Sequence, residues 1–212
     1  MASSLSRQQN RLNQQARIVR ATLDICRTKG LAHASLNAIA ARAKVAKGVV
    51  LYYFGTKENL IKSAFQSLAD GSIERLTAAV AAHMDQPPPA QIDALIDTLL
   101  DPQRYNFTDF AAYLDFAAHA AHVPKLAAVD DKANEQFAAI FEMALAPARV
   151  QGLIRPVSAI ESVSVLRALE EGLKLQWLLQ HDATQLPYLR ELCRTAFFRY
   201  LGLASSDEPV AL

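Results

Sequence analysis

Apolar residues recur every three or four positions along most of the chain, which is the periodicity of helices with one buried face. Between residues 11 and 29 the stripe consists of Leu12, Ala16, Val19, Leu23 and Cys26. The same spacing predicts further helices over residues 35–43, 46–53, 57–83, 91–100, 102–122, 124–151, 159–181 and 185–203. Because no segment shows the alternation typical of strands, the sequence predicts an all-α fold of about nine helices.

Residues that cap or interrupt helices mark several boundaries. Ser35, Thr56 and Ser158 are placed to act as N-caps, the last with a glutamate three residues later. Residues 85–90 contain three consecutive prolines and predict a linker, because consecutive prolines cannot continue a helix. Pro147 predicts a kink or a restart within its helix.

The formal net charge of +1 conceals a strong partition. Up to Lys62 the chain carries eleven Lys and Arg against two acidic residues, Asp24 and Glu58. The remainder carries eleven basic and nineteen acidic residues. A basic first third joined to an acidic body indicates that the first part meets a polyanion and the second does not.

Several classes of protein are disfavoured. The longest stretch without a charged residue is twelve residues, 30–41, which is short of the ~18 needed for a membrane span. The N-terminus is polar and lacks the apolar core of a signal peptide, so we expect a cytoplasmic protein. Cys26 and Cys193 lie far apart without metal-binding spacing, and the histidines form no ligand set, so no metal and no cofactor are expected.

Two short helices, residues 35–43 and 46–53, are joined by a tight turn and preceded by the helix of residues 11–29, which is a helix-turn-helix pattern. The side of the second helix expected to be exposed shows Ala46, Lys47, Gly48, Val49, Tyr52 and Tyr53. Small side chains allow close approach to a groove, and lysines and tyrosines can contact phosphates. The pattern therefore predicts a DNA-binding head.

The stretch SLNAIAARAKVAKGVVLYYFGTKENLIKSAF resembles the DNA-binding domain of the TetR (tetracycline-repressor-like) family of bacterial transcription regulators. The family pattern is met by Ser35, Ile39, Ala40, Ala43, Val45, Gly48, Phe54, Lys57 and Leu60. The chain departs from it at Lys44, where Gly is usual, at Ala46, where Ser is usual, and at Leu51, where Tyr is common. The part KGVVLYYFGTKENL is similar to a subgroup that includes regulators of choline and betaine genes.

The resemblance implies a dimeric, non-enzymatic regulator, most often a repressor, that a small-molecule effector releases from a palindromic double-stranded DNA operator. It places at the DNA the residues Ser35, Asn37, Ala46, Lys47, Gly48, Val49, Tyr52, Tyr53 and Lys57. It also implies a helix-turn-helix DNA-binding domain over residues 1–56 and a C-terminal effector-binding and dimerisation domain over residues 57–212.

The aromatic segment 105–122 is the candidate effector region. The residues chosen for this role are Asp109, Phe110, Tyr113, Phe116, His119 and, further along the chain, Trp177. Aromatic walls with a carboxylate suit an apolar or cationic effector, whereas the alternative is that the aromatic residues belong to the core.

Two apolar stripes near the C-terminus predict either a four-helix interface between two copies or part of the core. They consist of Val163, Leu166, Leu169, Leu173 and Trp177, and of Leu189, Leu192, Phe197, Tyr200 and Leu201. A rival hypothesis is an all-helical carrier or enzyme without DNA binding, but the sequence offers no nucleophile elbow or Gly-rich phosphate loop for it.

Overall fold

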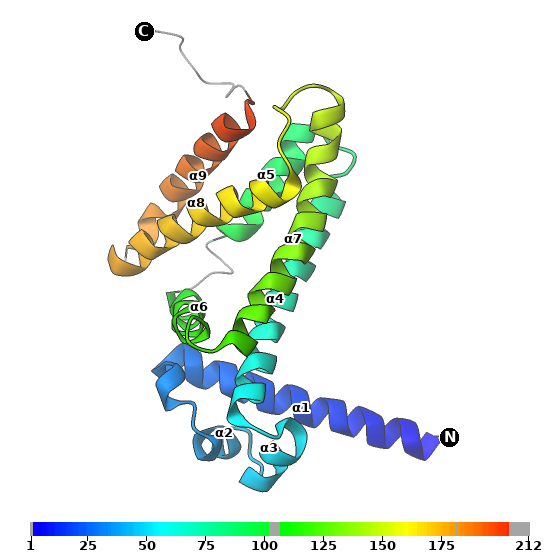
Figure 1. Ribbon diagram of the computed structural model, residues 1–212, viewed down its shortest axis with the longest axis vertical. Coiled ribbons are helices and arrows are strands. Elements are labelled where there is room, and N and C mark those ends of the chain that lie inside the picture. Colours follow the sequence, from blue (N-terminus) through cyan, green and yellow to red (C-terminus); the bar gives the residue numbers. More distant parts are fainter. Residues whose placement is uncertain (1, 102–106, 181, 204–212) are drawn as a thin grey trace. The chain divides into compact units, whose positions relative to one another are not determined.

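The computed structural model describes residues 2–101, 107–180 and 182–203, and these contain nine α-helices, two short 3₁₀ helices and no strand. The predicted all-α fold of about nine helices is confirmed. The α-helices are α1 (Ala2–Lys29), α2 (Leu36–Arg42), α3 (Lys47–Phe54), α4 (Lys57–Ala82), α5 (Pro88–Leu99), α6 (Phe107–Ala120), α7 (Pro124–Val150), α8 (Ala159–Gln180) and α9 (Leu186–Leu201) (Figure 1). The 3₁₀ helices are η1 (Leu31–His33) and η2 (Ala183–Gln185).

The chain packs into two compact units. Unit 1 holds residues 2–70 and 108–129, and unit 2 holds the other described residues. Unit 1 therefore contains α1 to α3, the first half of α4 and almost all of α6. The predicted functional division after residue 56 differs from this division by packing, and it stays a prediction.

Local sequence accounts for the helix starts that were predicted. The hydroxyl of Ser35 accepts a hydrogen bond from the Ala38 amide at 3.2 Å, and the hydroxyl of Thr56 accepts one from the Asn59 amide at 3.1 Å. The hydroxyl of Ser158 accepts from the Glu161 amide, also at 3.1 Å. Each bond satisfies one of the amide groups that have no partner within the first turn, so the three N-caps are confirmed.

Two helix starts differ from the prediction. Helix α1 begins at Ala2 rather than near residue 11, and α5 begins at Pro88, inside the stretch predicted to be a linker. Proline is tolerated in a first turn because its missing N–H would have no partner there. Helix α7 continues through Pro147 to Val150, so it does not restart there, and the predicted kink stays a prediction. The predicted helical residues 102–106 and 181, with the tail from residue 204, lie outside the described residues.

Each unit has its own apolar core. In unit 1, buried residues of α1 to α4 pack with others of α6 and α7, including Ile18, Ile39, Val50, Phe65 and Phe116. In unit 2, the core includes four residues of the predicted α8 stripe, namely Val163, Leu166, Leu173 and Trp177. These four are buried against their own chain, so for them the interpretation as core is correct.

No helix among the described residues is long and apolar enough to cross a membrane. Cys26, in unit 1, and Cys193, in unit 2, are both buried free thiols. Burial raises the pKa of the Cys193 thiol to about 12, with a smaller contribution from the nearby Glu170 carboxylate.

Candidate nucleic-acid interface

Helices α2 and α3 are joined by a short turn that contains a residue in the left-handed conformation. The Val45 amide donates to the Ala40 carbonyl at 3.0 Å, and the Lys44 amide donates to the Ala41 carbonyl at 3.1 Å. Lys44 has φ 53°, a conformation that costs an L-residue other than glycine roughly 1–2 kcal/mol. The family to which the sequence was compared usually has glycine at this position. Glycine adopts a positive φ without steric cost, so the backbone angle of Lys44 explains that preference.

One side of α3 is anchored and the other is open. Val50 is fully buried in the unit 1 core, and Val45 and Phe54 are partly buried against it. Lys47 and Gly48 are exposed, and Tyr52 is 77% exposed. A Cβ placed on Gly48 would meet no atom within 4 Å, so this part of α3 leaves room for another molecule to approach the backbone.

Not every predicted contact residue of α3 is equally open. Val49 and Tyr53 are partly buried against the unit 1 core. The Tyr53 hydroxyl donates a 2.8 Å hydrogen bond to Oε1 of Gln14 on α1, so Tyr53 ties the two helices together. Its ring meets that of Tyr52 edge to face, with centroids 5.1 Å apart. Tyr53 therefore positions Tyr52 and has a structural use of its own.

The other predicted contact residues lie at the start of α2, at the N-cap of α3 and on α4. Ser35 and Asn37, at the start of α2, and Ala46, the N-cap of α3, are exposed. Ala46 supplies no side-chain cap, so the first amides of α3 depend on water or a ligand. Lys57, in the first turn of α4, is half-buried.

Leu51 was treated in the sequence only as a departure from the family pattern. It is 37% exposed and follows Lys47 and Gly48 by one helical turn, so it shares their side of α3. Because residues three or four apart share one side of a helix, the spacing of residues 47, 48, 51 and 52 could have indicated that Leu51 belongs to the open side. An exposed apolar side chain here is suited to contact with a thymine methyl group.

The candidate effector residues of α6 have partners within unit 1. Asp109 forms an ion pair with Arg27 of α1, and Phe116 stacks on Phe65 of α4 with ring centroids 3.9 Å apart. The rings of Phe110 and Tyr113 stack at 5.9 Å. These contacts place the α6 aromatics among packed side chains, and their effector role stays a prediction.

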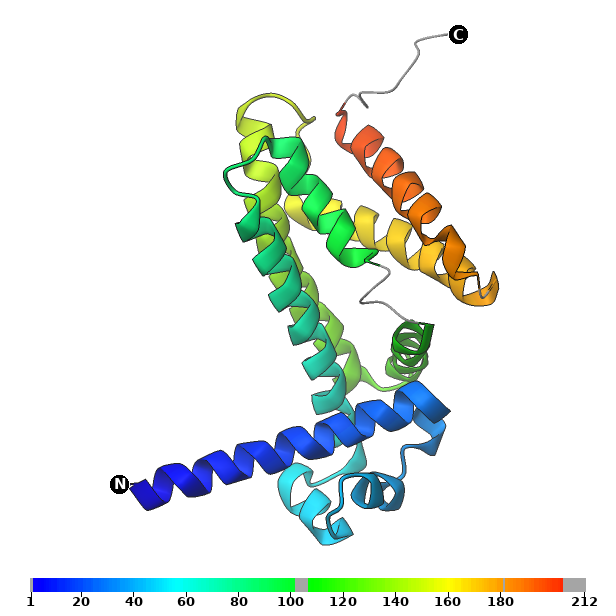
Figure 2. The same ribbon diagram turned by 180° about the vertical axis from the view of Figure 1, so that it is seen from behind.

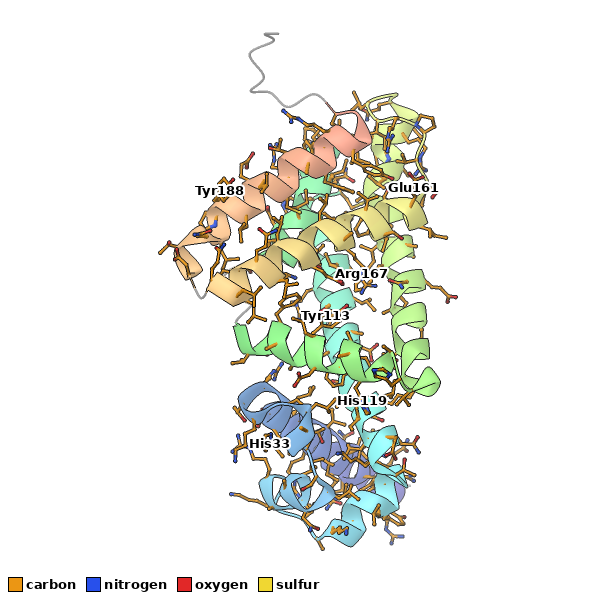
Figure 3. The ribbon with its side chains drawn as sticks, turned by 60° about the vertical axis from the view of Figure 1, so that its left-hand side comes forward. His33, Tyr113, His119, Glu161, Arg167 and Tyr188 are labelled. Atoms are coloured by element: carbon orange, nitrogen blue, oxygen red, sulfur yellow. The ribbon has the colours of Figure 1, made fainter. Side chains whose placement is uncertain are left out.

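The other two candidate effector residues have different surroundings. His119 is half-buried near the end of α6, where Figure 3 labels it together with Tyr113. Trp177 is 2% exposed in the core of unit 2. No group of three or more His, Cys, Asp or Glu side chains within the described residues is arranged to hold a metal ion.

Unit 2 has a groove of about 690 Å³ that none of the candidate effector residues lines. Its lining consists of Glu74, Arg75, Ala78, Ala79, Asp97, Thr98, Asp101 and Arg190. Three acidic and two basic side chains make it a polar groove, unlike the aromatic pocket that the sequence suggested.

Two family models match the chain. Residues 18–64 match the model described as bacterial regulatory proteins, tetR family, and residues 88–202 match the model of the C-terminal part of BetI-type transcriptional repressors. The second match covers more than half of the chain.

Among curated proteins, the HTH-type transcriptional regulator BetI of Stenotrophomonas maltophilia is 30% identical over 119 residues, which are 56% of this chain and 60% of that protein. BetI of Burkholderia thailandensis is 28% identical over 171 residues, covering 77% of this chain and 81% of that protein. Against several such relatives the chain spans only 54–60% of their length.

Solved structures share the fold. A transcriptional regulator from Rhodococcus superposes with a TM-score of 0.74 and 22% identity, covering 90% of this chain and 99% of that one. A transcriptional regulator from Saccharomonospora viridis, solved in complex with choline, superposes with a TM-score of 0.73 and 18% identity, covering 88% and 95%.

Proposed function

Because the chain belongs to the TetR family of bacterial regulatory proteins, we propose that it is a transcription regulator that binds DNA through the open side of α3. The observation that carries this proposal is the exposed set Lys47, Gly48, Leu51 and Tyr52 on a helix whose opposite side is anchored by Val50. A short helix of this kind can lie in the major groove with its N-terminal residues at base edges. Proteins of this family are regulators rather than enzymes, which disfavours the rival hypothesis of an enzyme.

The nine residues predicted from the sequence are proposed to serve DNA binding in different ways. Lys47 and Lys57 contact phosphates, and Tyr52 donates a hydrogen bond to the DNA backbone. Asn37 and Val49 read base edges, while Tyr53 acts mainly by holding α3 against Gln14. Ser35, Ala46 and Gly48 allow the backbone to approach closely.

A gel shift tests this proposal with DNA taken from upstream of the protein's own gene. Wild-type protein is expected to shift this DNA in preference to a scrambled duplex of equal length, and added salt weakens the shift. The Tyr52→Ala variant is expected to bind on the order of tenfold more weakly. Lys132→Ala, which removes an exposed charge from unit 2, is the control and leaves binding unchanged. If a variant with both Tyr52→Ala and Lys47→Ala binds the DNA as tightly as wild type does, the assignment of α3 as the DNA-binding helix is refuted.

We also propose that the regulator is a homodimer joined through α8 and α9. Five large apolar side chains on these helices are exposed in a single copy of the chain, namely Ile160, Leu175, Leu179, Tyr188 and Leu192. Ile160 and Leu179 are 71% and 73% exposed, and the small residues Ser164, Ala168 and Gly172 lie exposed between them at four-residue spacing. Small residues allow two helices to approach closely, so this face suits a second copy.

Analytical ultracentrifugation tests the dimer. Wild type is expected to sediment at twice the 23.2 kDa chain mass, and Leu179→Glu is expected to shift it to a single chain. Val150→Glu, the same change at an exposed apolar residue of α7, serves as the control and leaves the dimer intact. Two copies place two α3 helices on DNA, so a dimer requires a palindromic operator.

We propose that the protein is a repressor and that a small-molecule effector releases it from this operator. We further propose that the effector binds in the α6 region. Choline is the probe for a thermal-shift measurement, because it is the molecule bound in the Saccharomonospora viridis relative. A ligand that binds only the folded state raises Tm with concentration. If the α6 region holds it, Tyr113→Ala removes the shift and Glu74→Gln, in the groove of unit 2, does not. No change in Tm at any choline concentration would exclude choline.

A further inference from the structure

Helix α1 is much longer than the core that supports it. It contains 28 residues, but among the side chains described, which start at Arg7, the first buried one is that of Ile18, and those of residues 7–13 are all exposed. The match to the family model also begins at residue 18, so the preceding turns lie outside the part shared with the family. An exposed helix without tertiary packing is marginally stable, so these turns need a reason other than the core of unit 1.

The exposed turns continue the core-facing side of α1 with polar residues. Ile18, Ala21 and Ile25 form the buried stripe. At 100° per residue, positions 4, 7 and 11 before Ile18 lie within about 40° of the same direction. These positions are Gln14, Arg11 and Arg7, so the stripe changes from apolar to hydrogen-bonding and cationic residues where the core ends.

The same side of α1 faces the recognition helix. The Oε1 atom of Gln14 accepts the hydrogen bond from Tyr53 of α3, which fixes the direction of the stripe at this turn. Both views of the fold show α1 continuing past α3 toward its N-terminus (Figures 1 and 2). Arg7 lies seven residues before Gln14, about 10 Å along the helix axis at ~1.5 Å per residue. That distance is comparable with the ~12 Å width of a major groove.

The charge of this segment is of one sign. The first 23 residues contain four arginines, Arg7, Arg11, Arg17 and Arg20, and no acidic residue. None of the four takes part in an ion pair within the part of the chain that the structure describes. Guanidinium groups form bidentate hydrogen bonds with phosphates, and a duplex presents phosphates on both sides of the groove that α3 would occupy.

We propose that the extension of α1, residues 7–14, is a second DNA-binding surface, in which Arg7 and Arg11 bind phosphates next to the operator half-site. Phosphate contacts fix position and add affinity without reading sequence. The extension therefore lengthens the DNA covered by each protomer and leaves the sequence preference to α3. This inference rests on the function proposed above.

The test compares two duplexes, one that ends at the half-sites and one with about ten further base pairs on each side. The double variant Arg7→Ala/Arg11→Ala is expected to lose on the order of tenfold in affinity for the long duplex and little for the short one. Its plot of log affinity against log salt is expected to flatten by about 3.6, because roughly 0.9 is lost for each of four phosphate contacts in a dimer. Alanine preserves helix propensity, and circular dichroism verifies the helix.

Arg20→Ala is the matched control. Arg20 is exposed and lies nine residues from Arg11, which places it on the opposite side of the same helix. Its loss is expected to change neither the affinity nor the salt slope. If the double variant and wild type bind the long duplex with the same affinity and salt slope, the proposal is overturned. It is also overturned if Arg20→Ala loses as much affinity per charge as the double variant does.

Lys47→Ala separates this proposal from the one on which it rests. If Lys47→Ala weakens binding to both duplexes while the double variant binds like wild type, only the role of the extension fails. If wild type shifts neither duplex, both proposals fail.

Discussion

The two units of this chain differ in net charge and in how many of their basic side chains are paired, although unit 1 also has two ion pairs, Arg27 with Asp109 and Arg42 with Asp24. Unit 1 contains twelve Lys and Arg against five Asp and Glu, a formal net charge of +7, whereas unit 2 contains ten against sixteen, a net charge of −6. In unit 2, arginines 149, 167, 190 and 194 and Lys174 all form ion pairs with acidic residues. In unit 1, Lys44, Lys47 and Lys57 form none within the described residues.

The contrast separates charges that serve folding from charges that serve binding. A cation that is already paired within its own chain is less available to bind a phosphate. An exposed cation that stays unpaired lowers the free energy of unfolding only slightly, because exposed ion pairs contribute little to stability. The cores also differ in size, since among the described residues 24 are buried in the core of unit 2 and 17 in that of unit 1, five of the 17 being alanines. Unit 2 therefore has the larger apolar core, and unit 1 presents the unpaired lysines.

The largest expected effect lies in unit 2. Lys174 and Glu170 form a buried ion pair at 2.5 Å, so Lys174→Met leaves a buried carboxylate without its counter-ion and is expected to cost about 3–5 kcal/mol of unfolding free energy. The double variant Lys174→Met/Glu170→Met is expected to recover most of this loss. Urea denaturation measures both, and a single variant as stable as wild type would show that the pair does not matter.

The pH dependence of that variant follows from the same pair. Burial already raises the pKa of the Glu170 carboxyl, and removal of Lys174 raises it further. A carboxyl with a raised pKa in the folded state favours folding when protonated, and that contribution is lost as pH rises through the folded-state value. The deficit of Lys174→Met relative to wild type is therefore expected to shrink as pH falls, and a constant deficit would contradict this.

A smaller effect, of the opposite kind, is expected at Lys47 in unit 1. Lys47→Ala is expected to weaken operator binding on the order of tenfold. Its unfolding free energy is expected to stay within about 0.5 kcal/mol of wild type, because Lys47 is exposed and forms no ion pair within the described residues. Fluorescence anisotropy and urea denaturation measure the two quantities. A loss of stability equal to the loss of binding would remove the contrast between the units.

The next effect is expected at Lys44, whose backbone conformation destabilises the fold. Because its φ is 53°, Lys44→Gly should raise the unfolding free energy by about 1 kcal/mol. Lys44→Ala removes the same charge but keeps the unfavourable conformation, so it should not stabilise. If both variants gain equally, charge rather than backbone strain is the cause.

The smallest effect distinguishes the two cores without any change of sequence. Cys26 reports on unit 1 and Cys193 on unit 2, and both are buried. Neither thiol is expected to react quickly with a thiol reagent in the native state. As urea is added, Cys26 is expected to become reactive first because its unit has the smaller core. Simultaneous labelling would indicate that the two units unfold together.

How much could be predicted from the sequence depended on distance along the chain. The caps at Ser35, Thr56 and Ser158 were predictable because donor and acceptor lie three residues apart. The ion pair of Arg27 with Asp109 was not, because it joins residues 82 positions apart that only tertiary packing brings together. For the same reason Asp109 was placed in an effector pocket from its local aromatic neighbours alone.

The candidate interface on α3 could be predicted because one side of this short helix is anchored, so only residues on its other side are open to contact with DNA. Its detail could not, since the bond from Tyr53 to Gln14 depends on how α1 crosses α3. On α8, periodicity identified an apolar stripe but not its partner. The residues that remain exposed, such as Leu179, lie on the other side of the helix from buried Trp177 and Leu173.

The salt dependence of operator binding tests most directly whether the unpaired cations of unit 1 carry the interaction. The double variant Lys47→Ala/Lys57→Ala is expected to flatten the slope of log affinity against log salt by about 3.6 in a dimer, roughly 0.9 for each lost phosphate contact. Arg149→Ala/Arg190→Ala, which removes two paired cations from unit 2, is expected to leave the slope of wild type unchanged. Equal slopes for the two double variants would contradict the account.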